Sequence, residues 1–412
     1  MAQQPRSTLN NPSPLDSATA ANPYVRYKQL REEESVHWNQ GINSWTLTRY
    51  TDVLAALRDQ RLSSEQMSAI RGRLSETAAE KIQPLIRLFS DMMIMSDPPD
   101  HMRLRKLANK AFTPRVVDRM RSHIQNVVED LLDGIEKDGR QDGRFDVITD
   151  LAYPLPAVVI SEMLGVPDED RDQFRKWTGD LAGFLGNFRM VAETADTAQS
   201  SALEMSDYLR KIITQRRLEP QEDLISALVT AEEDGDTFSE AELYSMCILL
   251  MLAGHETTTN LIGNGLLALL QKRDQLERLQ ADPGMIETAV EEFLRYDSPI
   301  QAVARIAMED IELGGKRIEK GQRVSLILGA ANRDPDRFSN PDRLDIARED
   351  NRHLSFGFGS HFCLGAALAR LEAQTAVGGV VQRWPDLRLA TEKIEWRYNP
   401  SFRGLISLPV GF

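Results

Sequence analysis

The chain has 412 residues, with 49 lysines and arginines against 62 aspartates and glutamates, so its formal net charge is −13 at pH 7. This acidic balance argues against a nucleic-acid partner, and only two cysteines exclude a disulfide framework and favour a reducing compartment. Residues 1–22 are polar, and the longest apolar run, residues 246–253, is far short of the ~20 residues that span a membrane. We therefore expect a cytoplasmic protein with a flexible arm over residues 1–22 and neither signal peptide nor membrane anchor.

The first hundred residues predict short elements that lead into a methionine-rich segment. Residues 23–34 have a helical pattern, residues 45–50 alternate like a strand, and residues 51–59 return to a helical pattern. The irregular stretch that follows ends in Met92-Met-Ile-Met95. Methionine adapts to pockets of irregular shape, so Met92 is a candidate for a pocket wall, although plain core filling explains it equally well.

A helix is predicted after Asp97-Pro-Pro, and it carries two donors on one face. His101 and Arg105 are four residues apart, and such a pair suits two carboxylates, one of which an arginine grips with two hydrogen bonds. Residues 101–121 hold seven lysines and arginines against a single acid. A basic stretch of this kind is either a solvated face or a docking patch for an acidic protein.

Residues 145–215 predict several amphipathic helices, interrupted by a bend rich in Gly and Phe at residues 183–188. A capping box, Ser239-Glu-Ala-Glu242, then opens a long helix that extends to about Lys272 and is apolar nearly all round, hence buried. Glu256 and the three threonines that follow it break this apolar pattern. An acid inside a buried helix is costly, which marks a functional site, although a satisfied buried carboxylate is the alternative.

The next predicted helix, over residues 282–296, contains Glu292 and Arg295 at i, i+3. Spacing alone makes them a surface ion pair worth a few tenths of a kcal/mol, and Glu291 could pair with Arg295 at i, i+4 instead. A hairpin turn is predicted at Gly314-Gly315, and residues 319–328 read as a turn followed by a strand.

Residues 356–365 read Phe-Gly-x-Gly-x-His-x-Cys-x-Gly and run directly into a helix-forming segment, residues 366–374. The paired glycines suit a tight loop with positive φ. The sulfur of Cys363 is placed near a helix N-terminus, where we expect a lowered thiol pKa and a thiolate that can bind a metal ion. Gly365 would allow a flat macrocycle to approach the backbone. The alternative is a structural cysteine in a glycine turn.

This loop resembles the cysteine loop of the haem-thiolate monooxygenases, the cytochrome P-450 family, and further motifs match in the same order from about residue 23 onward. The resemblance implies a mainly α, single triangular fold with small β-sheets over residues 23–412. It also implies haem b as cofactor, held between the helix at residues 253–257 and the cysteine loop. The cofactor-binding residues that it implies are Cys363 as the iron ligand, His101, Arg105, Arg305 and His361 for the propionates, and Ala253, Gly254, Phe356, Gly357 and Gly365.

The same resemblance assigns the remaining candidate residues. Thr257 would hydrogen-bond dioxygen, Glu256 would pass protons toward it, and Gly254 would leave it room. Glu292 and Arg295 would form an internal ion pair completed by Arg343. The candidates for the substrate pocket are Met92, Phe184, Leu249, Ile300, Val303 and Phe402.

The implied reaction inserts one oxygen atom from O2 into a hydrophobic small molecule, such as a polyketide, terpenoid, steroid or fatty acid. Electrons would come from NAD(P)H through a reductase and a separate ferredoxin or flavodoxin. The alternatives are a haem-thiolate peroxygenase, an O2-independent haem enzyme, a non-catalytic haem sensor, and a zinc site at His361 and Cys363. The sensor lacks a fused signalling segment, and the zinc site lacks further ligands at suitable spacing.

Overall fold

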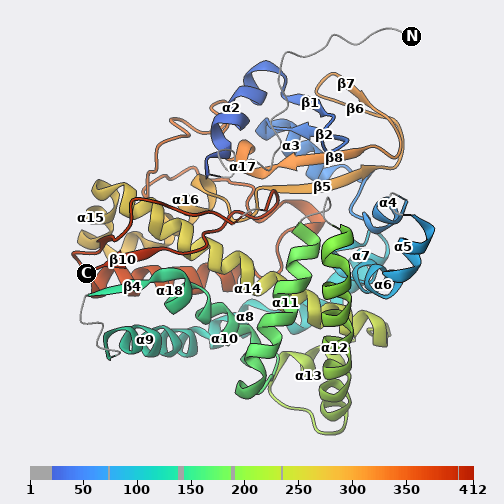
Figure 1. Ribbon diagram of the computed structural model, residues 1–412, viewed down its shortest axis with the longest axis horizontal. Coiled ribbons are helices and arrows are strands. Elements are labelled where there is room, and N and C mark those ends of the chain that lie inside the picture. Colours follow the sequence, from blue (N-terminus) through green and yellow to red (C-terminus); the bar gives the residue numbers. More distant parts are fainter. Residues whose placement is uncertain (1–20, 73–74, 138–142, 187–190, 233–234, 398) are drawn as a thin grey trace.

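Helices make up most of the structure, and a small sheet region lies at one end (Figure 1). The computed structural model describes residues 21–72, 75–137, 143–186, 191–232, 235–397 and 399–412. Most of the predicted arm, residues 1–20, and part of the predicted bend at residues 183–188 lie outside this range. The first described helix, α2 (Pro23–Glu33), begins at the predicted place, capped by Asn22. That residues 23–412 form a single domain stays a prediction.

The largest sheet has five strands in the order β1–β2–β8–β5–β3. Strands β2 and β8 are parallel, and the other neighbours are antiparallel. A separate hydrophobic cluster, which includes Leu47, Val53 and Leu326, packs against this sheet. The elements of this region are β1 (Val36–Asn39), β2 (Ser44–Leu47), β3 (Leu62–Ser63), β5 (Ala302–Ala307), β8 (Arg323–Ile327), α3 (Tyr50–Arg58) and α17 (Leu328–Ala331).

Two smaller sheets complete the strands. The two-stranded sheet turns at Gly314 and Gly315, whose φ values of 53° and 73° confirm the predicted hairpin. A three-stranded sheet has the order β4–β10–β9 and brings the C-terminal end of the chain beside residues 144–146. The strands are β4 (Arg144–Asp146), β6 (Ile311–Leu313), β7 (Lys316–Ile318), β9 (Arg388–Leu389) and β10 (Pro409–Gly411).

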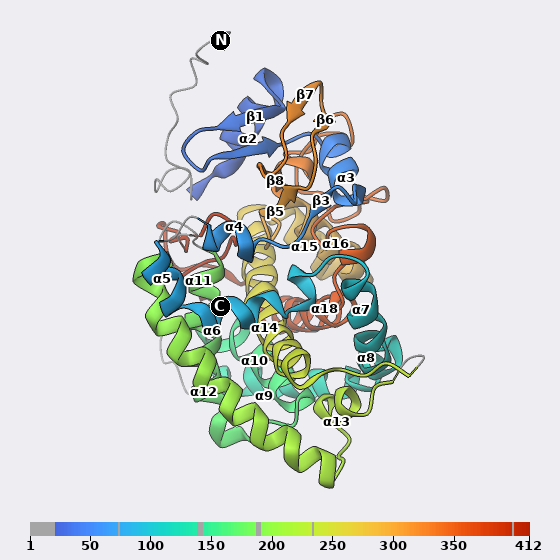
Figure 2. The same ribbon diagram turned by 90° about the vertical axis from the view of Figure 1, so that its right-hand side faces the viewer.

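Helix α14 (Glu240–Gln271) runs through the middle of the helical region in both views (Figures 1 and 2). It starts at the predicted capping box, in which Ser239 N donates to Glu242 Oε2 and Glu242 N donates to Ser239 Oγ. Its side chains are buried over most of its length because helices pack around it on several sides. The prediction of a long buried helix is therefore confirmed.

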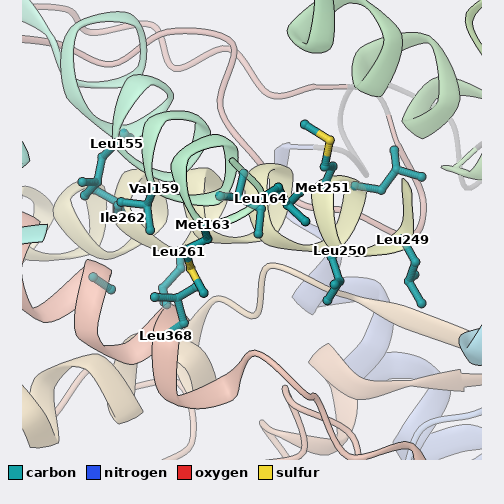
Figure 3. Packing of buried hydrophobic residues seen from close by; sticks show 14 of the residues in the cluster. Leu155, Val159, Met163, Leu164, Leu249, Leu250, Met251, Leu261, Ile262 and Leu368 are labelled. Carbon is teal, nitrogen blue, oxygen red and sulfur yellow. The ribbon is translucent and has the colours of Figure 1, made fainter. Parts of the chain in front are cut away.

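Helices α10 (Pro154–Met163) and α18 (Ala366–Arg383) flank α14. In Figure 3, Val159 of α10 lies beside Ile262 of α14, and Met163 meets Leu261 and Leu368. A third helix, α16 (Ile286–Tyr296), also approaches α14 closely. Glycine at position 265 allows this approach, because a Cβ there would lie 2.7 Å from the ring of Phe293 in α16. Helix α14 thus serves as the support on which the neighbouring helices are positioned.

The remaining helices surround this centre. They are α4 (Met67–Arg71), α5 (Glu76–Lys81), α6 (Gln83–Ser90), α7 (Asp100–Ala111), α8 (Pro114–Arg119), α9 (Arg121–Lys137), α11 (Arg171–Gly186), α12 (Val191–Leu218), α13 (Leu224–Val229) and α15 (Arg273–Ala281). Short helical turns are η1 (Met93–Met95), the π-turn η2 (Ile148–Ala152), η3 (Asp168–Asp170), η4 (Pro283–Met285) and η5 (Gly359–His361). Among the described residues, no helix combines the length and the apolar character that crossing a bilayer requires.

Candidate functional site

The cysteine loop forms a tight turn directly before α18. Gly357 and Gly359 have φ values of 71° and 75°, which confirms the predicted role of the glycines, and Cys363 N donates to Phe356 O at 2.9 Å. Gly365 is the N-cap of α18, so Cys363 lies close to a helix N-terminus as predicted. A Cβ at Gly365 would meet no described atom within 4 Å. The backbone there faces open space, as the approach of a flat macrocycle requires.

The electrostatics of Cys363 differ from the prediction. Burial raises the pKa of the Cys363 thiol, while the Gly365 N–H, Arg105 and Arg370 lower it. The expectation of a net lowered thiol pKa was wrong for the chain alone, because desolvation of the thiolate outweighs its attraction to nearby donors and cations. Coordination to a metal ion deprotonates a thiol outright. Binding to a metal ion such as iron would therefore stabilise the thiolate of Cys363.

Four donors from three separate parts of the chain gather beside this loop, and we call them the cationic cradle: His101, Arg105, Arg305 and His361. The rings of His101 and His361 lie 3.8 Å apart between centroids. Both ring nitrogens of His101 are buried and have no hydrogen-bond partner among the described residues. Arg305 Nη1 donates to its neighbour's carbonyl, Ala304 O, at 2.8 Å.

The cradle holds more positive charge than its protein surroundings balance. Burial, together with the positive charge of His101, Arg305 and Arg105, lowers the pKa of His361 to about 3. Burial also lowers the pKa of His101, Arg105 and Arg305, while the nearby Asp97 carboxylate raises the pKa of His101 and Arg305. The buried ring nitrogens of His101 lack hydrogen-bond partners among the described residues, which is costly, and a carboxylate placed here would satisfy them and balance the charge of the arginines. The cradle, the open backbone at Gly365 and the Cys363 sulfur therefore fit a haem with two propionates.

Helix α14 opens toward solvent at one place in its buried stretch. Ala253 is exposed, whereas the residues of the preceding turn, Leu249 to Leu252, are buried. A Cβ at Gly254 would lie 3.4 Å from the Ile160 side chain of α10, so this glycine has a packing reason of its own. A role for Gly254 beside dioxygen stays a prediction.

The two predicted relay residues, Glu256 and Thr257, point to different partners. Glu256 accepts from Arg397 Nη1 at 2.8 and 3.0 Å and from Asn260 Nδ2 at 3.4 Å. Thr257 Oγ1 donates to the backbone carbonyl of Ala253 at 2.8 Å. No hydrogen bond of the described residues joins Glu256 to Thr257, so the acid must turn away from Arg397 to reach the threonine.

Arg397 is a site residue that sequence reasoning missed. It lies 141 residues from Glu256 in an irregular C-terminal hairpin, and no motif marks it. Arg397 N donates to Gly404 O at 2.8 Å, and a Cβ at Gly404 would lie 1.8 Å from Asn260 Oδ1. This close approach, which only glycine allows, brings the hairpin onto α14 and hence Arg397 to Glu256.

The six predicted pocket residues are divided between two hydrophobic clusters and a β-bridge. Met92, Phe184 and Leu249 belong to the helical core, where Phe184 stacks on Phe89 with ring centroids 5.5 Å apart. Ile300 and Val303 pack against the cluster below the five-stranded sheet, and Phe402 pairs with Ile300 through a β-bridge. Their joint role as a substrate pocket stays a prediction.

The predicted internal ion pair is present, with a different third member. Glu292 and Arg295 are both fully buried and joined by two hydrogen bonds of 2.8 Å. Arg348 Nε, not Arg343, supplies the third charge, at 3.1 Å from Glu292 Oε2. The prediction of Arg343 was wrong because its side chain is exposed, and only its backbone carbonyl takes part, accepting from Arg295 Nη2 at 3.2 Å.

The alternative partner for Arg295 is also excluded. Glu291 binds Arg370 at 2.6 and 2.9 Å and His353 Nε2 at 3.1 Å. These contacts lower the pKa of Glu291 to about 2 against the opposing effect of burial. A zinc site is not supported either, because no group of three or more His, Cys, Asp or Glu side chains in the described part of the chain is arranged to hold a metal ion.

Comparisons with known proteins agree with this geometry. The sequence model of the family "Cytochrome P450" matches residues 86–283 and 284–401. The chain is 44% identical to "Polyketide biosynthesis cytochrome P450 PksS" of Bacillus subtilis, over 94% of this chain and 95% of that protein. It is 41% identical to "Vitamin D(3) 25-hydroxylase" of Pseudonocardia autotrophica, over 94% and 93% of the two chains. The crystal structure of P450BioI with an acyl carrier protein carrying hexadec-9Z-enoic acid superimposes with a TM-score of 0.89, at 41% identity over 96% of this chain and 100% of that one.

The corrected ion cluster predicts different effects for two arginines. Arg348→Met leaves the buried Glu292 carboxylate with one cation fewer, so we expect the free energy of unfolding to fall by about 3 kcal/mol. Arg343→Met is the matched control, and we expect a change within about 0.5 kcal/mol because its side chain is exposed. Urea unfolding followed by circular dichroism measures both. A larger loss for Arg343→Met than for Arg348→Met would contradict the assignment.

Proposed function

We propose, from the premise that this chain belongs to the cytochrome P450 family, that Cys363 is its ligand to haem iron. The protein is a cytochrome P450 monooxygenase, and its cofactor is haem b. When bound, haem supplies the redox centre at which one oxygen atom of O2 is transferred to substrate while the other is reduced to water with two electrons and two protons. The observation that carries the assignment is the cationic cradle with its unpartnered His101, next to the cysteine on its glycine turn.

The cradle residues would bind the two propionates. Arg105 and Arg305 supply charged donors, and His101 and His361 supply ring N–H groups. Hydrogen bonds from arginines to carboxylates are among the stronger ones in proteins, since donor and acceptor are both charged. Propionate binding by these side chains would also help to orient the haem beside Cys363.

Glu256 and Thr257 would deliver protons on the α14 side of the ring. The carboxyl of Glu256 is only partly buried and is held by Arg397. Rotation of its side chain away from Arg397 would carry the proton toward the hydroxyl of Thr257. Positioned acids of this kind accelerate proton transfer by about 10²–10⁴-fold.

The substrate would be a hydrophobic small molecule. The predicted pocket residues Met92, Phe184, Leu249 and Phe402 are all apolar, which suits a polyketide, terpenoid, steroid or fatty acid. Relatives whose names print a polyketide, a vitamin D and a carrier-bound fatty acid support this range of substrates. Within it, the pocket favours molecules that bind through apolar contact rather than through charge.

A separate ferredoxin or flavodoxin would dock on the face around the cysteine loop. Met102, which follows His101, and Phe358 and Phe362, which lie within the loop, are exposed there. The exposed cations Lys106, Lys110, Arg115 and Arg119 follow along α7 and α8. Arg103 of the basic stretch pairs with Glu242, and Arg105 belongs to the cradle, so neither contributes to this face. An apolar centre with a basic rim suits an acidic electron carrier.

The assignment of Cys363 predicts the spectrum of the carbon monoxide adduct. We expect the reduced holoprotein to absorb near ~450 nm with carbon monoxide and Cys363→Ser to shift the band to ~420 nm, because thiolate ligation causes the red shift. In the same holoprotein, hexadec-9Z-enoic acid or testosterone is expected to shift the Soret band on binding. A wild-type band at ~420 nm, or a band at ~450 nm in Cys363→Ser, would overturn the proposal.

The relay assignment predicts a loss of coupling in two variants. Glu256→Gln removes the acid without changing its size, so we expect product formation to fall by about 10²-fold. Thr257→Ala should divert electrons from product to hydrogen peroxide. Glu309→Gln, at an exposed site, is the control. The measurements are the product formed per NAD(P)H consumed and the hydrogen peroxide released. The peroxygenase would be favoured if two results came together. The enzyme would turn over equally fast with hydrogen peroxide and with O2, and Thr257→Ala would leave the coupling unchanged.

The docking face predicts a charge effect that is specific to its location. Lys110→Glu should weaken the binding of a reduced [2Fe–2S] ferredoxin by about 10-fold at low salt, since it inverts one charge on the basic rim. The difference should vanish at high salt because screening is then nearly complete. Lys320→Glu makes the same change on the far sheet region. Stopped-flow reduction rates across a ferredoxin titration give both affinities, and equal weakening by the two variants would place the partner elsewhere.

A further inference from the structure

A serine outside the cationic cradle reaches one of its histidines. Ser64, which directly follows β3, is 2% exposed, and its Oγ lies 3.1 Å from Nε2 of His361. The family resemblance gives Ser64 no role, and it lies almost 300 residues from the cysteine loop in sequence. The buried hydroxyl of Ser64 therefore contacts the imidazole of His361, one of the proposed propionate-binding residues.

Asp97 holds this serine in place. Its Oδ1 accepts from Ser64 N at 2.8 Å, and its Oδ2 accepts from the hydroxyl of Ser63. The backbone carbonyl of Asp97 accepts from His101 N at 2.9 Å, at the start of α7. One residue thus ties together the end of β3, which supports His361, and the first turn of the helix that carries His101.

The same corner of the structure also includes the strand of Arg305. Strand β3 pairs with β5 through Ser63 and Ile306, the residue that follows Arg305. Three of the four cradle residues are consequently connected, through backbone or side-chain contacts, to the group of residues Ser63, Ser64 and Asp97. At this group the sheet region, α7 and the cysteine loop meet.

Hydrogen-bond chemistry decides which role the serine hydroxyl takes. An uncharged imidazole carries one N–H group and one bare nitrogen, and the partner of one nitrogen determines the state of the other. If Nε2 carried the hydrogen, the other nitrogen would present a lone pair to any carboxylate, which is repulsive. If Ser64 Oγ–H donates to Nε2, then Nδ1 carries the hydrogen and can donate to a carboxylate.

We propose that Ser64 is a positioning residue of the haem site, which donates to Nε2 of His361 and leaves Nδ1–H for a propionate, while Asp97 fixes Ser64. The proposal rests on the proposed haem-binding role of His361. Ser64 touches neither iron nor the reacting atoms, and it acts only through the orientation and the tautomer of the His361 ring. Second partners of this kind commonly set how tightly a prosthetic group is held.

The rate of haem loss tests the proposal. The holoprotein is mixed with an excess of apomyoglobin, which accepts the released haem. Ser64→Ala should release haem about fivefold faster than wild type, because one hydrogen bond to the imidazole of His361 is lost. Asp97→Asn should act in the same direction. Ser64→Thr keeps the hydroxyl and should stay close to wild type. Ser68→Ala, at an exposed position on α4 a few residues away, is the matched control.

A double-mutant cycle separates this role from a general loss of stability. In the His361→Ala background, Ser64→Ala should cause no further acceleration, because the ring through which it acts is gone. Additive effects of the two substitutions, or an unchanged rate in Ser64→Ala, would overturn the proposal. If His361→Ala retains no haem, the resonance Raman propionate bending band of Ser64→Ala decides, and an unshifted band counts against the serine. A wild-type carbon monoxide band at ~420 nm would instead contradict the proposed ligand, which keeps the two failures distinct.

Discussion

The buried guanidinium of Arg295 is the interaction on which the geometry of the site depends. It bonds Glu292 with two hydrogen bonds and donates to the carbonyls of Asn332, Pro341 and Arg343, so α16 holds the segment that leads to the cysteine loop. Ser355 Oγ adds a bond to Leu294 O at the start of that loop. A buried charge without partners is costly, so loss of these contacts would destabilise the fold. The position of Cys363 is therefore set by a charge cluster that takes no part in the chemistry.

The second organising feature is the cationic cradle, whose positive charge exceeds the negative charge of the carboxylates near it. Around Arg295 every donor has an acceptor, whereas the cationic cradle gathers two arginines and two histidines near a single carboxylate, Asp97. A protein tolerates such a surplus where a ligand supplies the missing anions, and the two propionates of haem do so in the proposed function. Ser64 and Asp97 connect this cluster to elements far apart in the chain.

In the proposed proton relay, the structure gives the acid and the threonine different partners. Glu256 is held by Arg397, and Thr257 bonds its own helix. The hairpin that carries Arg397 also carries Phe402, which pairs with Ile300 of the predicted pocket. The C-terminal hairpin thus contacts both Glu256, the proposed proton source, and Ile300 of the predicted substrate pocket.

The sequence by itself determined those features that depend on local chemistry. The capping box and apolar run of α14 and the glycine turns at Gly357 and Gly359 follow from neighbours within a few residues, where spacing dictates geometry. Only the tertiary structure decided the rest. Arg348 displaces Arg343, Arg397 meets Glu256 and Ser64 meets His361 because packing brings distant segments together, and burial outweighs local donors in setting the thiol pKa of Cys363. Such contacts leave no periodicity in the chain, since each depends on where the remaining elements come to lie.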